Sequence, residues 1–127
     1  MPLFYFDTSA ILKRYKTEKG SQVIDELFDK KAPGEIFASS FLTALEVLST
    51  ASRALRGKQL SRRAFDQLTA RFLGDFSSLF QIGSVDNSII ASSITVTTQQ
   101  RLRPADAIHL ATVQRIGRSW PELKKWL

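Results

Sequence analysis

The chain has 127 residues, of which 43% are hydrophobic, and its eighteen Lys and Arg against twelve Asp and Glu give a net charge of +6. This length and apolar content predict one domain with a buried core and exclude a wholly disordered chain. The absence of cysteine excludes disulfides, zinc–thiolate sites and thiol catalysis. The basic excess attracts polyanions such as nucleic acids, but it also serves solubility, so charge alone leaves both interpretations open.

The first part of the chain predicts alternating strands and helices. Residues 3–6 form a short apolar, aromatic run typical of a buried strand, and an acidic and hydroxyl turn separates it from helical residues 10–15. A second helix is expected over 21–30, and a strand over 35–39 follows the break at Pro33 and Gly34. Strand, turn and helix form the first half of a βαβ unit, so we expect an α/β fold with a parallel sheet.

The second part continues the alternation. Two helices are expected over 42–56 and 61–76, the first ended by Gly57 and the second capped by Ser61. The first of these helices is expected to turn one face to the core: Leu45, Leu48, Ala51, Ser52 and Leu55. The remaining expected elements are a strand over 79–83, a helix over 87–99 capped by Asp86, and a helix over 104–116 beginning at Pro104. Within the helix over 87–99, the β-branched run 94–98 also fits a strand.

The sequence predicts neither export nor membrane insertion. The N-terminus has no basic region before an apolar stretch, which a signal peptide requires. No apolar run approaches the roughly 20 residues of a membrane-spanning helix. We therefore expect a cytoplasmic protein with no membrane partner.

Asp7 and Asp106 each have a functional and a structural interpretation. Asp7 directly follows the first expected strand, where parallel sheets gather functional groups, but it is equally suited to cap the next helix for about 1 kcal/mol. Asp106 lies in the first turn of its helix, where the macrodipole favours negative charge. His109, one turn later on the same face, is interpreted as a packed or supporting residue, with metal ligation or general-base chemistry as the alternative.

Glu46 is the third acid of interest. If Leu45 points to the core, a step of about 100° places Glu46 at the edge of the apolar stripe, where it can reach into a cleft. Its alternative is a surface pair with Arg53, which would contribute little.

Together the three acids suggest a metal site if they converge. Carboxylates held close together repel one another, and some become protonated unless a cation neutralises them. Oxygen-only sites suit Mg²⁺ or Mn²⁺, and such an ion lowers the pKa of bound water and polarises a phosphoryl oxygen. The acids lie far apart in the sequence, so spacing alone does not establish convergence.

Three segments of the chain form recognisable motifs: Phe4-Tyr5-Phe6-Asp7-Thr8-Ser9-Ala10, Leu42-Thr43-Ala44-Leu45-Glu46-Val47-Leu48 and Leu102-Arg103-Pro104-Ala105-Asp106-Ala107-Ile108-His109-Leu110-Ala111-Thr112. The third is the most specific and has the form L-R-x-x-D-A-x-H-L-A. Together they resemble PIN-domain proteins, and among these the VapC-type toxins of bacterial toxin–antitoxin pairs, over about residues 3–116 in family order. The resemblance implies a single PIN-like domain over 1–127, with a three-layer α/β fold whose central parallel sheet is flanked by helices. It also favours helix over strand at 94–98.

The same resemblance implies an activity and partners. It implies a metal-dependent endoribonuclease whose catalytic acids Asp7, Glu46 and Asp106 hold Mg²⁺ or Mn²⁺. Thr8 and Ser9 would support the first acid or its bound water. RNA is the implied substrate, and the implied partners are a second copy of the chain and a small cognate antitoxin whose tail enters the acidic cleft.

Residues 117–127 depart from the family pattern. Such proteins continue into a strand ending in Thr-x-Asp, which supplies a fourth acid, and then into a final strand; here we expect the C-terminal strands to be missing or altered. Glu122, after Pro121, resembles the start of a short helix and is not assigned the fourth role. A missing strand would leave an open edge beside the first strand, to be covered by Trp120, Trp126 and Leu127 or by a second chain. Truncation or a reading-frame change near Gly117 would explain the departure, and a missing fourth acid predicts weaker metal binding.

Basic residues cluster around the turn between the helices over 42–56 and 61–76, and we interpret them as contacts to RNA phosphates or as a solvated turn. They are Arg53, Arg56, Lys58, Arg62 and Arg63. The leading function is an active ribonuclease. The alternatives are a degenerate PIN domain that binds antitoxin or RNA without cutting, and a DNA-directed nuclease with the same metal chemistry.

Overall fold

The computed structural model describes residues 2–119 and 123–126. Strands and helices alternate along the chain as expected, and their order positions the residues that follow. The elements are β1 (Leu3–Phe6), α1 (Thr8–Tyr15), α2 (Ser21–Asp29), β2 (Ile36–Ser40), α3 (Phe41–Arg56), α4 (Arg62–Leu79), β3 (Phe80–Gly83), α5 (Asn87–Gln99), α6 (Pro104–Ser119) and β4 (Leu123–Trp126).

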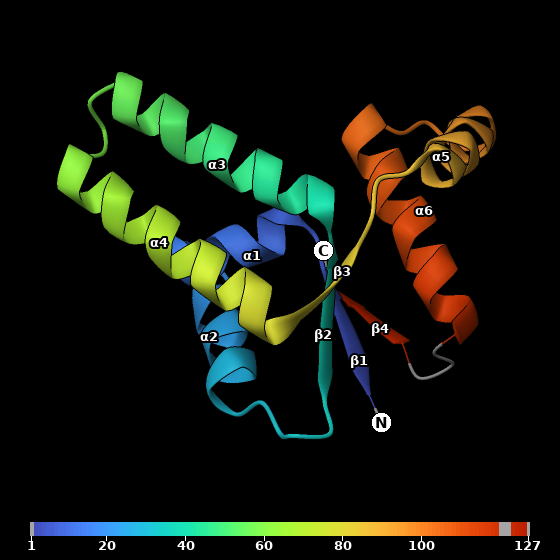
Figure 1. Ribbon diagram of the computed structural model, residues 1–127, viewed down its shortest axis with the longest axis horizontal. Helices are drawn as coiled ribbons and strands as arrows, with labels where there is room; N and C mark the ends of the chain where they lie inside the picture. Colours follow the sequence, from blue (N-terminus) through green and yellow to red (C-terminus); the bar gives the residue numbers. More distant parts are fainter. Residues whose placement is uncertain (1, 120–122, 127) are drawn as a thin grey trace.

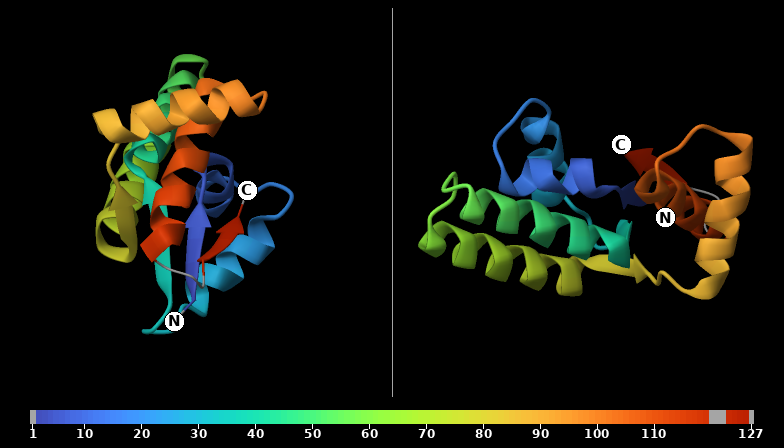
Figure 2. Two further views of the ribbon diagram at one scale, coloured as in Figure 1. Left: turned by 90° about the vertical axis from the view of Figure 1, so that its right-hand side faces the viewer. Right: turned by 90° about the horizontal axis from the view of Figure 1, so that it is seen from above.

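The four strands form one parallel sheet in the order β3-β2-β1-β4. Helices α1 to α4 cover one face of this sheet, and α5 and α6 cover the other (Figure 1). The right-hand view of Figure 2 shows the same division, with the α3–α4 hairpin and the α5–α6 pair on opposite sides. The three-layer α/β fold with a central parallel sheet is therefore confirmed.

Strand β1 builds both halves of the core because successive side chains of a strand point to opposite faces. Phe4 and Phe6 pack into an aromatic cluster with the helices of the α1–α4 layer. Leu3 and Tyr5 pack on the other face with Val113 of α6. A strand buried on both faces explains the uninterrupted apolar run that predicted it.

Capping residues set where the helices begin. The carboxylates of Asp7 and Asp86 and the hydroxyl of Ser61 each accept a hydrogen bond from a backbone N–H in the first turn of α1, α5 and α4. The caps expected at Ser61 and Asp86 are thus confirmed.

Helix α5 includes the β-branched residues 94–98, which confirms helix over strand. Buried Ile89, Ser93 and Val96 recur on one face, so tertiary packing overrides the local preference for a strand. The hydroxyl of Thr97 donates to the carbonyl of Ser93 one turn earlier. None of the described helices is both long and apolar enough to span a membrane.

The core-facing side of α3 differs from the prediction. Leu45 is 68% exposed, whereas Thr43, Val47 and Ala51 are buried. Thr43 faces inward because its hydroxyl bonds to Ser39 Oγ at 2.8 Å, and Ser39 in turn donates to the carbonyl of Phe6. The expectation that Leu45 faces the core is wrong, because the hydrogen bond between Ser39 of β2 and Thr43 of α3 fixes the rotation of the helix.

The C-terminal end also differs from the prediction. Residues 123–126 form β4, which pairs in parallel with β1, so a strand of this chain that includes Trp126 covers the edge beside β1. The short sequence Leu-Lys-Lys-Trp lacks a clear strand pattern, and pairing with β1 decides its conformation. It contains no acid, so no fourth carboxylate comes from this strand. The helix expected at Glu122 and the roles suggested for Trp120 and Leu127 fall outside the described residues.

Gly83, at the end of β3, allows α6 to approach the sheet. A Cβ atom at this position would lie 2.7 Å from Cγ2 of Thr112, which is too close for ordinary van der Waals contact. A residue without a side chain therefore lets α6 rest against the carboxyl ends of the strands, where the candidate site lies.

Candidate functional site

A cavity of about 490 Å³ opens between the end of β1 and the first turns of α6. Both Asp7 and Asp106 line it, as does Ser9, so the fold joins residues almost a hundred positions apart. The full lining is Tyr5, Asp7, Ser9, Gln100, Leu102, Asp106, His109 and Leu110. Two of the three predicted acids are thus brought to one place, beyond the carboxyl end of a parallel strand.

Asp7 caps α1 and also lies at the cavity. Its Oδ1 accepts a hydrogen bond of 2.9 Å from the amide of Ala10, which caps α1 and fixes the carboxylate at the cavity. Asp106 lies in the first turn of α6, as expected, and its carboxylate is exposed. The structural reasons for both acids therefore coexist with a position at the cavity.

Glu46 is connected to the cavity through hydrogen bonds. Its Oε1 accepts a bond of 2.5 Å from the hydroxyl of Thr8 and lies 3.1 Å from Nε2 of His109, which itself lines the cavity. Thr8 thus supports Glu46 and not the adjacent Asp7. Glu46 does not form the surface pair with Arg53 that was the alternative, because the Arg53 guanidinium donates to Ser49 and Thr50 instead.

His109 is the centre of this network. It is 6% exposed, its Nδ1 lies 2.8 Å from the hydroxyl of Tyr5, and its ring packs edge-on against Tyr5 at 6.0 Å between centroids. Burial raises the pKa of Tyr5 well above its ordinary value, and the negative charges of Asp7 and Glu46 raise it further, against a lowering hydrogen bond from Thr112. The phenol of Tyr5 is therefore protonated at neutral pH.

The interpretation of His109 as a packed or supporting residue agrees with its burial and its contact to Glu46, whereas the sequence analysis does not single out Tyr5. Tyr5 is the one residue of its strand with a polar side-chain atom, and a buried tyrosine hydroxyl needs a partner. That requirement is a signal that could have pointed to His109.

The described residues do not present a closed metal cage. Across residues 2–119 and 123–126, no three Asp, Glu, His or Cys side chains are gathered closely enough to hold an ion together. The cavity nevertheless offers carboxylate and hydroxyl oxygens, the donors that hard divalent cations prefer. Glu46 uses Oε1 for both of its hydrogen bonds, and Oε2 has no hydrogen bond within this part of the chain.

The predicted basic cluster lies away from this cavity. Arg56 ends α3 and Lys58, Arg62 and Arg63 follow around the hairpin turn, which Figure 1 shows at the end of the hairpin remote from the sheet. Arg62 is paired with Asp66 at 3.3 Å.

A different pair of cations borders the cavity. Arg101 and Arg103 are exposed in the loop between α5 and α6, where the alternate residues Gln100 and Leu102 line the cavity. Neither guanidinium group makes a hydrogen bond or an ion pair within the described part of the chain. The sequence does not single out these two arginines, because they lie outside the basic cluster and only the fold brings them next to the cavity.

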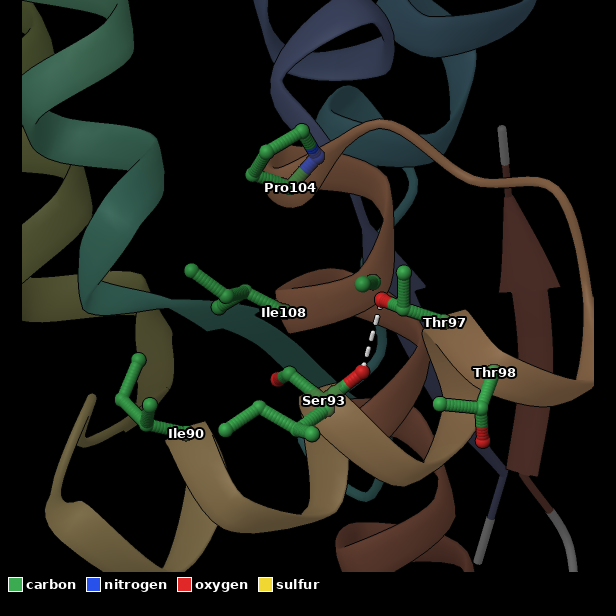
Figure 3. A pocket seen from close by; sticks show the side chains of 8 residues that line it. Ile90, Ser93, Thr97, Thr98, Pro104 and Ile108 are labelled. Atoms are coloured by element: carbon green, nitrogen blue, oxygen red, sulfur yellow. Dashed lines mark hydrogen bonds between the residues drawn. The ribbon is translucent and has the colours of Figure 1, made fainter.

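The opposite side of α6 carries a second hollow, of about 300 Å³, between α5 and α6 (Figure 3). Ile90 and Ile94 on its rim are 40% and 63% exposed. None of the residues that line it is charged: Ile90, Ser93, Ile94, Thr97, Thr98, Pro104, Ala107 and Ile108.

Comparison with known proteins gives consistent results. Residues 4–120 match the family model of the PIN domain. The chain is 30% identical over 117 residues to Ribonuclease VapC45 of Mycobacterium tuberculosis (strain CDC 1551 / Oshkosh), covering 92% of this chain and 78% of that protein. Ribonuclease VapC49 of Mycobacterium tuberculosis (strain ATCC 25618 / H37Rv) is similar to the same extent.

Solved structures share the fold. Mycobacterium tuberculosis VapC20, described as a toxin that cleaves the sarcin–ricin loop, superposes with a TM-score of 0.65 at 17% identity, covering 91% of this chain and 83% of that chain. A toxin–antitoxin complex from Klebsiella pneumoniae gives 0.62 at 19% identity, with 98% and 96% covered. VapBC2 from Rickettsia felis, bound to a promoter DNA fragment, gives 0.66 at 12% identity, with 98% and 99% covered. At these identities the likeness concerns the fold alone.

Proposed function

Because this chain belongs to the PIN-domain family, we propose that it is a VapC-type endoribonuclease that hydrolyses RNA phosphodiester bonds with a divalent metal ion. The observation that carries this proposal is the single cavity that joins Asp7 and Asp106, with Glu46 linked to it through His109. The two relatives named as ribonucleases support RNA as the substrate.

The donors of the cavity suit Mg²⁺ or Mn²⁺. Asp7, Glu46 and Asp106 would hold the ion, which would supply a water of lowered pKa and polarise the phosphoryl oxygen. Magnesium keeps several of its waters and binds directly through one or two carboxylates. Two acids that line a cavity of about 490 Å³, with a third linked to it through His109, therefore suit it better than a tight cage would.

The chain's own residues prepare the site for this chemistry. The cap bond from Ala10 holds Asp7 in place, and the bonds from Thr8 and His109 hold Glu46, so neither carboxylate has to be reoriented when substrate arrives. Ser9 lines the cavity beside Asp7 and offers a hydroxyl to a bound water or phosphate oxygen. Preorganised oxygen donors of this kind lower the barrier by their fixed positions.

RNA would follow the positive loop beside the cavity. Arg101 and Arg103 lie next to residues that line it, so their guanidinium groups can contact phosphates flanking the scissile bond. Arg53, Arg56, Lys58, Arg62 and Arg63 remain candidates for a more distant stretch of RNA.

The proposed protein partners use two different surfaces. A small antitoxin would place its tail in the acidic cavity and so exclude the ion and RNA. A second copy of the chain would cover the uncharged groove of Ile90, Ile94 and Ile108. Since each copy carries a net charge of +6, a contact surface without charged residues avoids the repulsion that other faces would bring.

The absence of an acid from β4 favours a second candidate, a PIN domain that binds antitoxin or RNA without cutting. The two candidates differ in whether the carboxylates at the cavity are needed for turnover.

The test is cleavage of structured RNA in the presence of Mn²⁺, with a matched DNA substrate beside it. We expect the wild-type chain to cut RNA, and Asp7→Asn and Asp106→Asn each to lower the rate by at least about 100-fold, since each variant removes a charged metal donor. The control is Asp66→Asn, which removes an acid of α4 that pairs with Arg62; this variant should cut RNA at the wild-type rate. Equal residual cleavage by all the proteins would refute the proposal that the chain is an enzyme. Faster cleavage of the DNA substrate would show that the chain is a DNA-directed nuclease.

A further inference from the structure

We propose that His109 is a positioning residue that orients the Glu46 carboxylate through an Nε2–H donor, and that the hydroxyl of Tyr5 holds the imidazole in this tautomer. The inference rests on the proposed metal role of Glu46, but the hydrogen-bond network can be tested without any metal.

The donors and acceptors of the network select one arrangement. An ionised carboxylate such as Glu46 only accepts hydrogen bonds, so Nε2 of His109, at 3.1 Å from Oε1, must be the donor. A neutral imidazole with a proton on Nε2 carries a lone pair on Nδ1. The Tyr5 hydroxyl, at 2.8 Å, then donates to Nδ1.

Tyr5 is suited to this task because it is completely buried and therefore lacks water as an alternative partner. The hydroxyl of Thr112, which lies nearby, donates to the carbonyl of Ile108 at 2.7 Å, so it can take the phenol proton only as an acceptor. The imidazole nitrogen at 2.8 Å is a stronger acceptor than a hydroxyl oxygen, and the phenol proton therefore goes to Nδ1 of His109.

The network ties together four separate elements. Tyr5 comes from β1, Thr8 from α1, Glu46 from α3 and His109 from α6. The bonds from Thr8 and His109 fall on the same oxygen, Oε1, and leave Oε2 for a metal ion or its water. Groups that orient a metal ligand in this way typically change metal affinity or activity by about 10–100-fold when they are removed.

The first test reads the tautomer directly. His109 is the only histidine in the chain, so ¹⁵N-labelled histidine gives one pair of ring-nitrogen resonances with no assignment problem. In metal-free protein at alkaline pH, we expect the pattern of a protonated Nε2 and an unprotonated Nδ1, and Tyr5→Phe should shift it toward a mixture of tautomers. A proton on Nδ1 in the wild-type protein would overturn the inference.

The second test uses two substitutions that keep different halves of the imidazole. His109→Gln retains an amide donor near the position of Nε2, whereas His109→Asn retains an amide near Nδ1 and loses the donor to Glu46. We expect Mn²⁺ affinity, measured by electron paramagnetic resonance on folded protein, to fall at least about tenfold in His109→Asn but by less than about threefold in His109→Gln.

Three outcomes separate this inference from the proposed function. Equal weakening in both variants, with thermal unfolding showing both folded, would mean that His109 acts only by packing. Unchanged affinity in both variants would also overturn the positioning role. If Asp7→Asn leaves Mn²⁺ affinity unaltered, the proposed metal site fails, while the ¹⁵N pattern still decides whether the network exists.

Discussion

Helix α6 separates two hollows of opposite character. Asp106 and His109 on one side line a polar cavity of about 490 Å³, whereas Ala107 and Ile108 on the other line an uncharged groove of about 300 Å³. Residues three and four apart share a helix face, so neighbouring positions in one short segment serve both hollows. The segment 102–112, which carries the most specific family motif, therefore contributes residues both to the candidate site and to the groove between α5 and α6.

The two sides also differ in how charge is handled. The polar cavity gathers Asp7, at the end of β1, and Asp106 of α6, and it lies beside Arg101 and Arg103, which suits a metal ion and a polyanion. The groove is built on α5, which contains no charged residue at all. We therefore assign the two sides to different partners, and four experiments can break or sharpen that assignment.

The largest expected effect is on self-association. Ile94→Asp puts a charge into the proposed contact of two copies and should weaken dimerisation by at least about 100-fold, measured by analytical ultracentrifugation. Since Ile94 is 63% exposed in one chain, the fold and the Mn²⁺ affinity should be unchanged. Thr95→Asp, also exposed but outside the groove, is the matched control. A dimer that tolerates Ile94→Asp would remove the groove from the interface.

A smaller effect is expected on RNA binding. Replacing Arg101 and Arg103 by Gln should lower RNA affinity about tenfold at low salt and reduce the salt dependence by about one phosphate contact per arginine. The same double change at Arg62 and Arg63 alters net charge equally but lies at the remote hairpin turn. If filter binding finds equal losses, general charge and not the loop attracts RNA.

Metal binding should appear as added thermal stability. At free Mn²⁺ of ten times the dissociation constant, linkage adds about 1.4 kcal/mol, or roughly 5 °C in melting temperature. Asp7→Asn should lose this rise, yet keep α1 intact in the absence of metal because asparagine caps helices as well as aspartate. Calorimetry that shows the same rise in both proteins would place the ion elsewhere.

The smallest effect concerns Asp86, which ties α5 to α6 by caps and ion pairs. Hydrogen bonds from Arg115 and the Ile89 amide lower the pKa of Asp86 from 3.8 to about 2. Because the folded-state pKa is depressed, the carboxylate stabilises the fold above about pH 4, and this contribution is lost as pH falls through about 2. Melting curves of wild type and Asp86→Asn should differ slightly at neutral pH and approach each other as pH falls from about 4 to 2. A difference that does not shrink over this range would contradict the lowered pKa of Asp86.

Much of the architecture followed from local sequence alone. The aromatic run of β1, the caps Ser61 and Asp86, and Pro104 at the start of α6 act through neighbouring residues, so their patterns already specify where elements begin. The family motifs likewise indicated Asp7, Glu46 and Asp106, although only their surroundings in the fold could join them.

Other features depended on contacts between distant residues. The rotation of α3, which exposes Leu45, follows from the bond between Ser39 and Thr43, and β4 forms only because β1 offers a pairing edge. The link from Tyr5 through His109 to Glu46 spans more than a hundred positions, and no local pattern encodes it. Sequence thus determined most of the elements and indicated the acids. Tertiary packing decided which of their atoms meet, because hydrogen bonds between elements depend on positions in space and not on spacing along the chain.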